Sequence, residues 1–217
     1  MISVLCPSRG RERELQAALT SLNATAASAR DLELLIRLDN DDPELRWYTR
    51  VVFENQHLTI GPREGYANLH RYYNELAADA HGDYLLLWND DARMLTPGWD
   101  SIVRDALDPT IPAVGSFDGP DYALFPIVTR AFYEALGHFS LSPHCDGWVQ
   151  EVAKAAGCFT HLPGVTVEHL RDELDDETKR EGTTAQQTLT SAAFYSDEMV
   201  ALRSADAEKV KAALVTA

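Results

Sequence analysis

Residues 82–99 read GDYLLLWNDDARMLTPGW, and this stretch decides the fold that we expect for the chain. Residues 84–88 are mostly large and apolar, which predicts a central strand buried on both faces. The apolar run stops at three polar residues, Asn89, Asp90 and Asp91. Open α/β sheets bind ligands just past the carboxyl ends of such strands, so these side chains are candidates for a binding site.

The side-chain oxygens of Asn89, Asp90 and Asp91 suit a hard divalent cation, Mg²⁺ or Mn²⁺. Such a cation can in turn bind a diphosphate, which favours chemistry on a nucleotide-linked substrate. An acidic turn is the alternative, because Asn and Asp are also preferred in loops and at helix caps. Taken alone, the stretch leaves both interpretations open.

Length and composition indicate one globular domain. The chain has 217 residues, of which 45% are hydrophobic, which is enough for a sizeable core. The formal net charge is −15, with 34 acidic against 19 basic residues. This charge disfavours a broad electrostatic contact with nucleic acid or an anionic membrane. It also increases the need for a metal ion if an anionic diphosphate is to bind.

The cysteines and the amino terminus indicate a reducing compartment. Cys6, Cys145 and Cys158 are too few and too irregularly spaced for a disulfide framework. The first ten residues lack the basic start and long apolar run of a signal peptide. No segment approaches ~18 uninterrupted apolar residues, so no membrane span is expected. We therefore expect a soluble, cytoplasmic protein.

The first half of the chain predicts alternating strands and helices. The expected strands are residues 2–6, 32–38, 51–53, 58–60 and 84–88, and the expected helices are 13–22 and 66–80. Short links between them imply right-handed crossovers and a mostly parallel sheet. Polar clusters follow three of these strands, at 7–9, 39–42 and 89–91. Because the carboxyl ends of parallel strands share one edge of a sheet, these clusters are expected to converge.

The second half is less regular. The expected helices are 99–107, 129–136, 146–156 and 205–215, with Thr129 as a candidate cap, and the expected strands are 114–117, 123–128, 159–162 and 166–169. Residues 171–190 are highly polar with little periodicity, which is typical of a mobile segment.

The order of these pieces resembles the nucleotide-diphospho-sugar transferases of the GT-A fold, especially family-2 glycosyltransferases. The resemblance covers residues 2–171. Residues 2–22 resemble the first strand and helix, and LIRLDNDDP (35–43) resembles the second strand with its acidic end. Residues 65–91 resemble the long signature that ends in a DxD-type site, and TPGW (96–99) is another common feature. The family's DxD site is here Asn89-Asp90-Asp91, and its usual Arg-Asn pair is here Tyr73-Asn74.

The resemblance implies a single GT-A (Rossmann-like) α/β domain over 1–217, with a mostly parallel central sheet flanked by helices. Its nucleotide-sugar-binding half is 1–100, its acceptor and catalytic half is 101–170, and a polar lid loop with a C-terminal helix is 171–217. The implied activity is that of a metal-dependent, inverting glycosyltransferase of the hexosyltransferase type, with a UDP-sugar as the expected donor and Mn²⁺ or Mg²⁺ as the cofactor.

The resemblance also implies roles for particular residues. Asp39 corresponds to the aspartate that contacts uridine or its ribose, and a carboxylate suits this because it accepts hydrogen bonds. Asp91 is the first choice as a metal ligand, followed by Asn89, and His169 lies where many GT-A enzymes supply a histidine to the cation. The donor is expected to contact Pro7, Ser8, Arg9, Asp39, Asn74, Asn89 and Asp90.

Asp146 is the candidate general base for the acceptor hydroxyl. It opens the expected helix 146–156 and precedes Trp148, which resembles the family's Glu-Asp followed by Trp, with Cys145 in place of the Glu. The helix N-terminus favours the ionised carboxylate that a base requires. A plain N-cap is the alternative role, and Glu151 is a weaker candidate base. Arg11 and Arg13 are interpreted as solvated charges on a helix face.

Two other functions stay open. A sugar-phosphate nucleotidyltransferase has similar architecture but usually carries a Gly-rich basic loop after the first strand, where this chain has PSRGRER. A non-catalytic GT-A-like binding domain is the other alternative. The acceptor cannot be read from the sequence: a saccharide, a small molecule, or a modified DNA base of the kind found in phages are the candidates. Nucleic acid is expected only as such a modified-base acceptor, and residues 171–190 are either a lid over the nucleotide or a solvated tail.

Overall fold

The computed structural model describes residues 1–48, 53–118, 125–170, 176–188 and 191–217. Within these residues the chain forms one sheet of eight strands in the order β3-β2-β1-β4-β7-β6-β8-β5. The strands β3, β2, β1 and β4 pair in parallel with one another, and β6 pairs in parallel with β8. β7 is antiparallel to both β4 and β6, and β5 is antiparallel to β8. The strand bounds are β1 Ile2–Ser8, β2 Leu32–Asp39, β3 Gln56–Gly61, β4 Tyr84–Leu87, β5 Ala92–Met94, β6 Val114–Asp118, β7 Ile127–Thr129 and β8 Phe159–His169.

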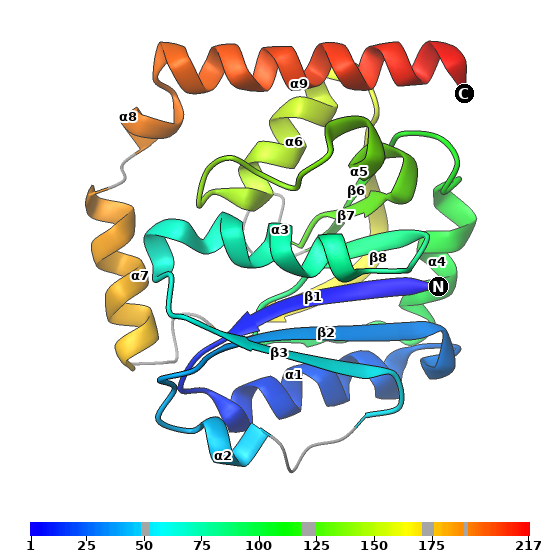
Figure 1. Cartoon of the computed structure of the whole chain (residues 1–217). Coiled ribbons are helices and arrows are strands. Elements are labelled where there is room, and N and C mark those ends of the chain that lie inside the picture. Colours follow the sequence, from blue (N-terminus) through cyan, green and yellow to red (C-terminus); the bar gives the residue numbers. More distant parts are fainter. Residues whose placement is uncertain (49–52, 119–124, 171–175, 189–190) are drawn as a thin grey trace.

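Helices cover both faces of this sheet (Figure 1). One face packs on α1 and α4, and the other packs on α3, α5 and α6, with α9 lying across α5 and α6 as an outer layer. The helix bounds are α1 Glu12–Thr25, α2 Leu45–Tyr48, α3 Leu69–Asp79, α4 Trp99–Ala106, α5 Arg130–Leu136, α6 Cys145–Ala156, α7 Glu177–Thr188, α8 Ser191–Phe194 and α9 Asp197–Thr216, with 3-10 turns at Ala29–Asp31 and Tyr66–Asn68. The predicted α/β domain with a mostly parallel central sheet is confirmed.

The central strands are apolar because both of their faces are buried. In β4, Tyr84 and Leu86 face the α1 layer, while Leu85 and Leu87 face the α3 layer, and all four are at most 4% exposed. Gly82 brings this strand close to β1. A Cβ atom at Gly82 would lie 2.5 Å from Ser3 Oγ and 2.7 Å from Ser3 N. The glycine therefore permits the close pairing of β4 with β1, which sets the edge at which the polar strand ends meet.

Local sequence signals are confirmed where neighbouring residues decide the structure. Thr129 caps α5, because its hydroxyl accepts a hydrogen bond from Phe132 N at 3.3 Å. The helix expected at 13–22 is α1, and that expected at 146–156 is α6. The helix expected at 66–80 begins as a 3-10 turn and becomes α-helical only at Leu69.

Other predictions are corrected or fall outside the described residues. The strands expected at 159–162 and 166–169 are one continuous strand, β8, and β5 was not predicted. The helix expected at 205–215 begins earlier, at Asp197. Of the expected strand 123–128, residues 123–124 lie outside the described residues, as do residues 51–52 of the strand expected at 51–53.

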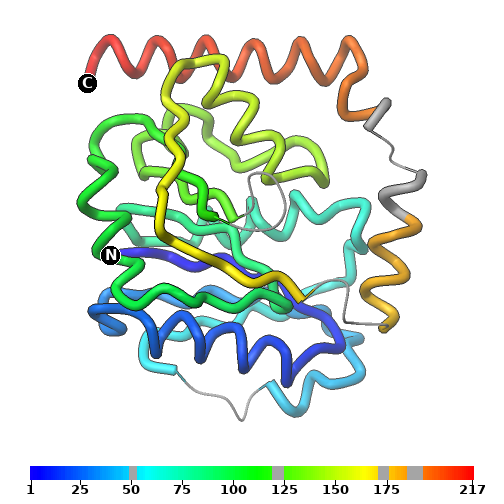
Figure 2. Tube along the Cα trace, turned by 180° about the vertical axis from the view of Figure 1, so that it is seen from behind, coloured from blue at the N-terminus to red at the C-terminus, as the bar shows by residue number. Residues whose placement is uncertain are grey.

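The polar segment 171–190 contains a helix rather than a plain loop. Residues 177–188 form α7, while 171–175 and 189–190 lie outside the described part of the chain. Figure 2 shows that β8 runs toward the side of the molecule on which α7 lies. In the described residues, no helix is long and apolar enough to span a bilayer.

Candidate functional site

A cavity of about 410 Å³ lies at the carboxyl ends of β1, β2 and β4, with α7 along one side. This is the edge at which the sequence predicted a convergence of polar strand ends. The cavity brings together nearly all of the predicted site residues: Pro7, Ser8, Arg9, Asp39, Asn89, Asp90, Asp91, Asp146 and His169. Asn74 is the exception, since it does not line the cavity.

Asn74 instead holds a neighbouring loop in place. Its side-chain oxygen accepts hydrogen bonds from Phe139 N at 2.7 Å and Ser140 N at 3.1 Å, and its Nδ2 donates to Ser140 O at 2.8 Å. These bonds tie α3 to the loop that leads into α6, the helix that carries Asp146. In this structure the contribution of Asn74 to the site is therefore positional.

Asp90 and Asp91 form a buried acidic pair in the turn that follows β4. Asp90 Oδ2 accepts a hydrogen bond from Ser8 Oγ at 2.7 Å, so the ends of β1 and β4 are joined. Asp91 Oδ1 lies 3.0 Å from His169 Nε2 at the end of β8. Asn89 Oδ1 accepts a hydrogen bond from the hydroxyl of Tyr73, another residue of the cavity lining, at 3.2 Å.

Arg11 is the residue that the sequence interpretation misplaced. It was expected to be a solvated helix-face charge, but its side chain is 7% exposed and its Nη1 lies 3.0 Å from Asp90 Oδ1 and 3.1 Å from Asp91 Oδ2. The turn at Gly10, with φ of 62°, leaves Arg11 as the N-cap residue of α1, with a backbone conformation that is not helical, so its side chain lies off the helix face. The sequence signal was its position directly after a turn glycine. Arg13, by contrast, is exposed as expected.

Burial and charge separate the pKa values of the two aspartates. Burial raises the pKa of Asp90 to about 6, and the charge of Asp91 adds to this effect while Arg11 and Ser8 oppose it. Burial also penalises the charge on Asp91. There, however, the hydrogen bond and charge of His169, together with Arg11, outweigh burial and lower the pKa. Asp91 is therefore the better anionic ligand of the pair.

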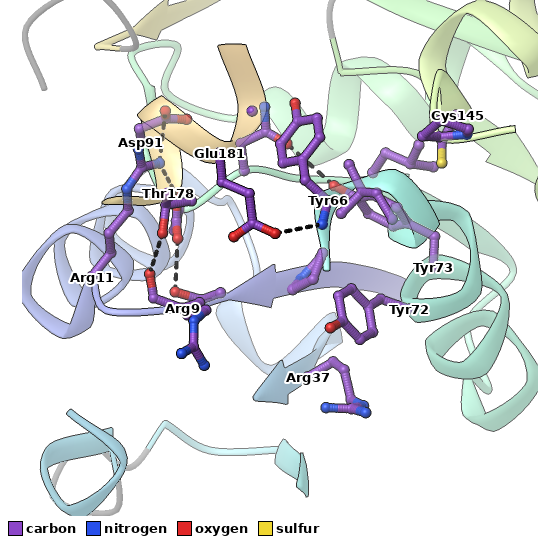
Figure 3. Close-up of a pocket in the computed structure, with 18 of the residues that line it drawn as sticks. Arg9, Arg11, Arg37, Tyr66, Tyr72, Tyr73, Asp91, Cys145, Thr178 and Glu181 are labelled. Carbon is purple, nitrogen blue, oxygen red and sulfur yellow. Dashed lines mark hydrogen bonds and ion pairs between the residues drawn. The ribbon is translucent and has the colours of Figure 1, made fainter. Parts of the chain in front are cut away.

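Asp39 is held on the opposite side of the cavity by Tyr72 and Arg9. Its Oδ1 accepts from the Tyr72 hydroxyl at 2.8 Å, and its Oδ2 lies 3.3 Å from Arg9 Nη1. Burial raises the pKa of Asp39 against the opposing effects of Tyr72 and the nearby arginines. Arg37, which the sequence interpretation overlooked, packs its guanidinium over the Tyr72 ring at 4.8 Å (Figure 3). A lone arginine within an apolar strand was the available signal.

Asp146 faces the cavity from α6. It is exposed, and its Oδ1 accepts a hydrogen bond from Gly147 N at 2.8 Å. The N-cap residue of α6 is His144, and Asp146 lies within the first turn. The structure thus places a carboxylate from α6 in the same cavity as the polar strand ends.

Helix α7, within the segment that the sequence left as either a lid or a solvated tail, forms one wall of the cavity. Thr178 Oγ1 donates to Arg9 O at 2.8 Å, and Glu181 accepts from Tyr66 N at 3.2 Å (Figure 3). Glu181 also pairs with Arg63 at 2.5 Å. These contacts join α7 to both the β1 side and the α3 side of the cavity.

Asp91 and His169 are suited to a divalent cation. Asp91 Oδ1 and His169 Nε2 lie 3.0 Å apart, and a carboxylate oxygen and an imidazole nitrogen are both donors that Mn²⁺ accepts. Across the ranges that the structure describes, no group of three or more His, Cys, Asp or Glu could hold a metal ion. Asp91 and His169 are thus two residues in the cavity that could supply donors to a divalent cation.

Comparisons with known proteins give structural matches only. No protein-family model matches the sequence, and no curated protein matches it either. Residues 1–349 of S. aureus TarS, in complex with UDP-GlcNAc, superpose with a TM-score of 0.64 at 13% identity, covering 99% of this chain and 71% of that one. The mannosyltransferase PcManGT from Pyrobaculum calidifontis, in complex with GDP-Man and Mn²⁺, gives a TM-score of 0.64 at 14% identity, with 99% and 86% covered. The chain spans 42% of the longer TarS chain. At these identities the likeness establishes the fold.

Proposed function

We propose that this chain, which has the GT-A fold of nucleotide-sugar glycosyltransferases, transfers a sugar from a nucleotide-diphospho-sugar to an acceptor hydroxyl with inversion. One observation carries the proposal: a single cavity contains Asp39, the Asp90–Asp91 pair with His169, and Asp146. These groups suit a nucleoside, a diphosphate with its cation, and an acceptor hydroxyl. Residues 1–100 then supply the donor side, 101–170 the acceptor side, and α7 the wall over the donor.

Asp39 and the turn after β1 form the nucleoside side of the cavity. The Asp39 carboxylate is fixed by Tyr72 and Arg9, so it can accept hydrogen bonds from a base N–H or from ribose hydroxyls. The complexes of the two structural neighbours contain a uridine and a guanosine nucleotide, so the fold alone accommodates either base. We expect a UDP-sugar for this chain.

Asp91 and His169 would hold the cation. When bound, Mn²⁺ or Mg²⁺ offsets the negative charge that develops on the departing diphosphate. Asp91 keeps its charge because His169 and Arg11 lower its pKa.

Asp146 acts as the base on the acceptor side. Its exposed carboxylate takes the proton of the acceptor hydroxyl as the oxygen forms a bond to the anomeric carbon and the bond to the diphosphate breaks. Attack from the side opposite the leaving group inverts the anomeric centre.

The test is a thermal-shift panel of UDP-, GDP-, dTDP- and CMP-sugars, each with Mn²⁺ and with EDTA. A ligand at 100 times its Kd stabilises the native state by about 2.7 kcal/mol, which for a domain of this size raises Tm by roughly 5–10 °C. We expect this shift with one nucleotide and Mn²⁺. A panel with no shift in any condition contradicts the proposal and favours the non-catalytic alternative.

Two variants then separate the roles within the site. We expect Asp91→Ala to lose the Mn²⁺-dependent shift and donor turnover, measured as release of nucleoside diphosphate. Asp146→Asn should keep the shift and lose turnover by about 100-fold or more. Near wild-type turnover in Asp146→Asn would remove Asp146 as the base, and release of pyrophosphate from a nucleoside triphosphate would select the nucleotidyltransferase alternative.

A further inference from the structure

Arg11 is a buried cation with two separate sets of partners. Its Nη1 bridges Asp90 and Asp91 at the end of β4. Its other edge forms two parallel bonds to Asp176, from Nε to Oδ2 at 2.6 Å and from Nη2 to Oδ1 at 2.9 Å. Asp176 directly precedes α7, so the second partner comes from the segment that leads into the helix beside the cavity and not from the sheet. Asp176 itself is not among the residues that line the cavity.

The edge of Arg11 that holds Asp176 is the edge that a phosphate would use. A guanidinium binds carboxylates and phosphates with the same two parallel N–H···O bonds. The first set of partners fixes the guanidinium, because Asp90 and Asp91 are 7% and 8% exposed in their side chains. Asp176 is 31% exposed, which makes it the partner that can be exchanged.

The charges around Arg11 also favour an exchange. Three carboxylates, those of Asp90, Asp91 and Asp176, surround a single guanidinium. A diphosphate cannot enter beside all three without strong repulsion, whereas release of Asp176 would free one bidentate position. Lys179, in the first turn of α7, lines the same cavity, and its ammonium makes no ion pair with any residue in the described ranges.

We propose that Arg11 binds the diphosphate of the donor, and that Asp176 occupies its outer edge until the donor displaces it. This inference rests on the proposed function, because it assigns the diphosphate part of the same site. Asp176 then competes with the donor for Arg11. The free energy of donor binding is the favourable free energy of the Arg11–phosphate contact reduced by the free energy needed to break the Arg11–Asp176 pair.

Asp176→Asn is the variant that isolates this competition. Asparagine caps helices as well as aspartate does, so the hydrogen bond from Lys179 N to Oδ1, 2.7 Å in the wild type, can be kept. The substitution removes the charge that competes for Arg11, and it replaces Oδ2, which accepts from Arg11 Nε, with an amide N–H group that cannot accept this bond. Glu208→Gln is the matched control, because Glu208 is an exposed helical acid paired with Lys211, away from the cavity lining.

The measurement is isothermal titration of UDP, GDP and uridine into each variant, in EDTA and in MnCl₂. We expect Asp176→Asn to bind the preferred nucleoside diphosphate about ten times more tightly than wild type in EDTA, with uridine affinity unchanged, and Glu208→Gln to match wild type. Arg11→Lys, which keeps the charge without the fork, should bind the diphosphate about ten times more weakly while uridine affinity again stays constant.

The outcomes separate this inference from the proposed function. If wild type binds a nucleoside diphosphate but Asp176→Asn binds it no more tightly, the exchange is refuted and the glycosyltransferase proposal stands. If the gain in Asp176→Asn extends equally to uridine, the effect is on the cavity and not on a phosphate contact, which also refutes it. If wild type binds neither diphosphate in either condition, both proposals fail. Asp176→Asn lies at a partly exposed position, so the test holds even if Arg11→Lys does not fold.

Discussion

Removal of the Tyr72 hydroxyl tests whether the nucleoside side of the cavity is built as we infer. The hydroxyl donates to Asp39 Oδ1 at 2.8 Å and accepts from Glu64 N at 2.6 Å and Gly65 N at 3.1 Å. It therefore joins α3, the end of β2 and the turn after β3. Tyr72→Phe deletes these three bonds and keeps the ring that packs against Arg37.

The expected loss follows from the three partners. A hydrogen bond to a charged group contributes about 1.5–3 kcal/mol and a neutral one about 0.5–1.5 kcal/mol. Glu64 and Gly65 are half-buried, so water replaces part of what their N–H groups lose. We expect Tyr72→Phe to lower the free energy of unfolding by about 2–3 kcal/mol, which for this size is roughly 5–10 °C in Tm.

The same variant should change the pH dependence of donor binding. The Tyr72 hydrogen bond lowers the pKa of Asp39 against the larger effect of burial, which raises it. Without that bond the pKa of Asp39 rises further. Because the ionised carboxylate is the form that accepts hydrogen bonds from the nucleoside, binding should be lost at a higher pH on acidification than in wild type.

Urea unfolding and titration of the preferred nucleoside diphosphate between pH 5 and 8 measure both effects. Tyr133→Phe is the matched control, because the Tyr133 hydroxyl is half-buried and makes no hydrogen bond with any residue in the described segments. The proposed role of the Tyr72 hydroxyl would be refuted by two results together. Tyr72→Phe and Tyr133→Phe would have free energies of unfolding equal within about 0.5 kcal/mol, and Tyr72→Phe would bind the nucleoside diphosphate with the same pH dependence as wild type.

Two further predictions concern the acidic pair and the β1–β4 pairing. Burial raises the folded-state pKa of Asp90 to about 6 from its ordinary value of 3.8, so ionising Asp90 costs stability as the pH rises through this window. As the pH rises from 4 to 7, the free energy of unfolding of Asp90→Asn should therefore increase relative to that of wild type by up to ~3 kcal/mol, measured by urea unfolding. A difference between the two proteins that does not change with pH would contradict this. Gly82→Ala should destabilise by about 1–3 kcal/mol, because its Cβ would lie 2.5 Å from Ser3 Oγ. Gly147→Ala, whose Cβ would meet the Phe194 ring at 3.3 Å in a helix, should be near neutral in the same assay.

Sequence patterns were sufficient to predict the helices, strands and caps that depend on residues close together in the chain. The apolar run before Asn89, the helical spacing in α1 and the Thr129 cap depend on side chains a few positions apart, and all three are confirmed. Strand–helix alternation predicted parallel strands, and the parallel pairing of β1, β2 and β4 brings their polar carboxyl ends to one edge of the sheet. That rule of topology is why most of the candidate site could be named before any coordinates.

The remaining features depend on residues that are distant in the chain. Two predicted strands near the end proved to be one, β8, whose pairing with β6 and β5 is decided by the packed sheet. Asn74 was expected at the donor, yet its amide is used by the backbone of residues 139–140. The sequence pattern cannot distinguish a contact with the donor from a bond to the backbone of a loop, since an amide side chain can make either one equally well.

By itself, the sequence determined an α/β domain with acidic strand ends at one edge of its sheet, because periodicity and turn chemistry act over a few residues. Only the tertiary structure decided that Arg11 turns into the acidic pair and meets Asp176, a partner 165 positions away. It also decided that α7 forms a wall of the cavity. Contacts at such separations form when the whole core packs, because burying a charge is favourable only after its partners are in place.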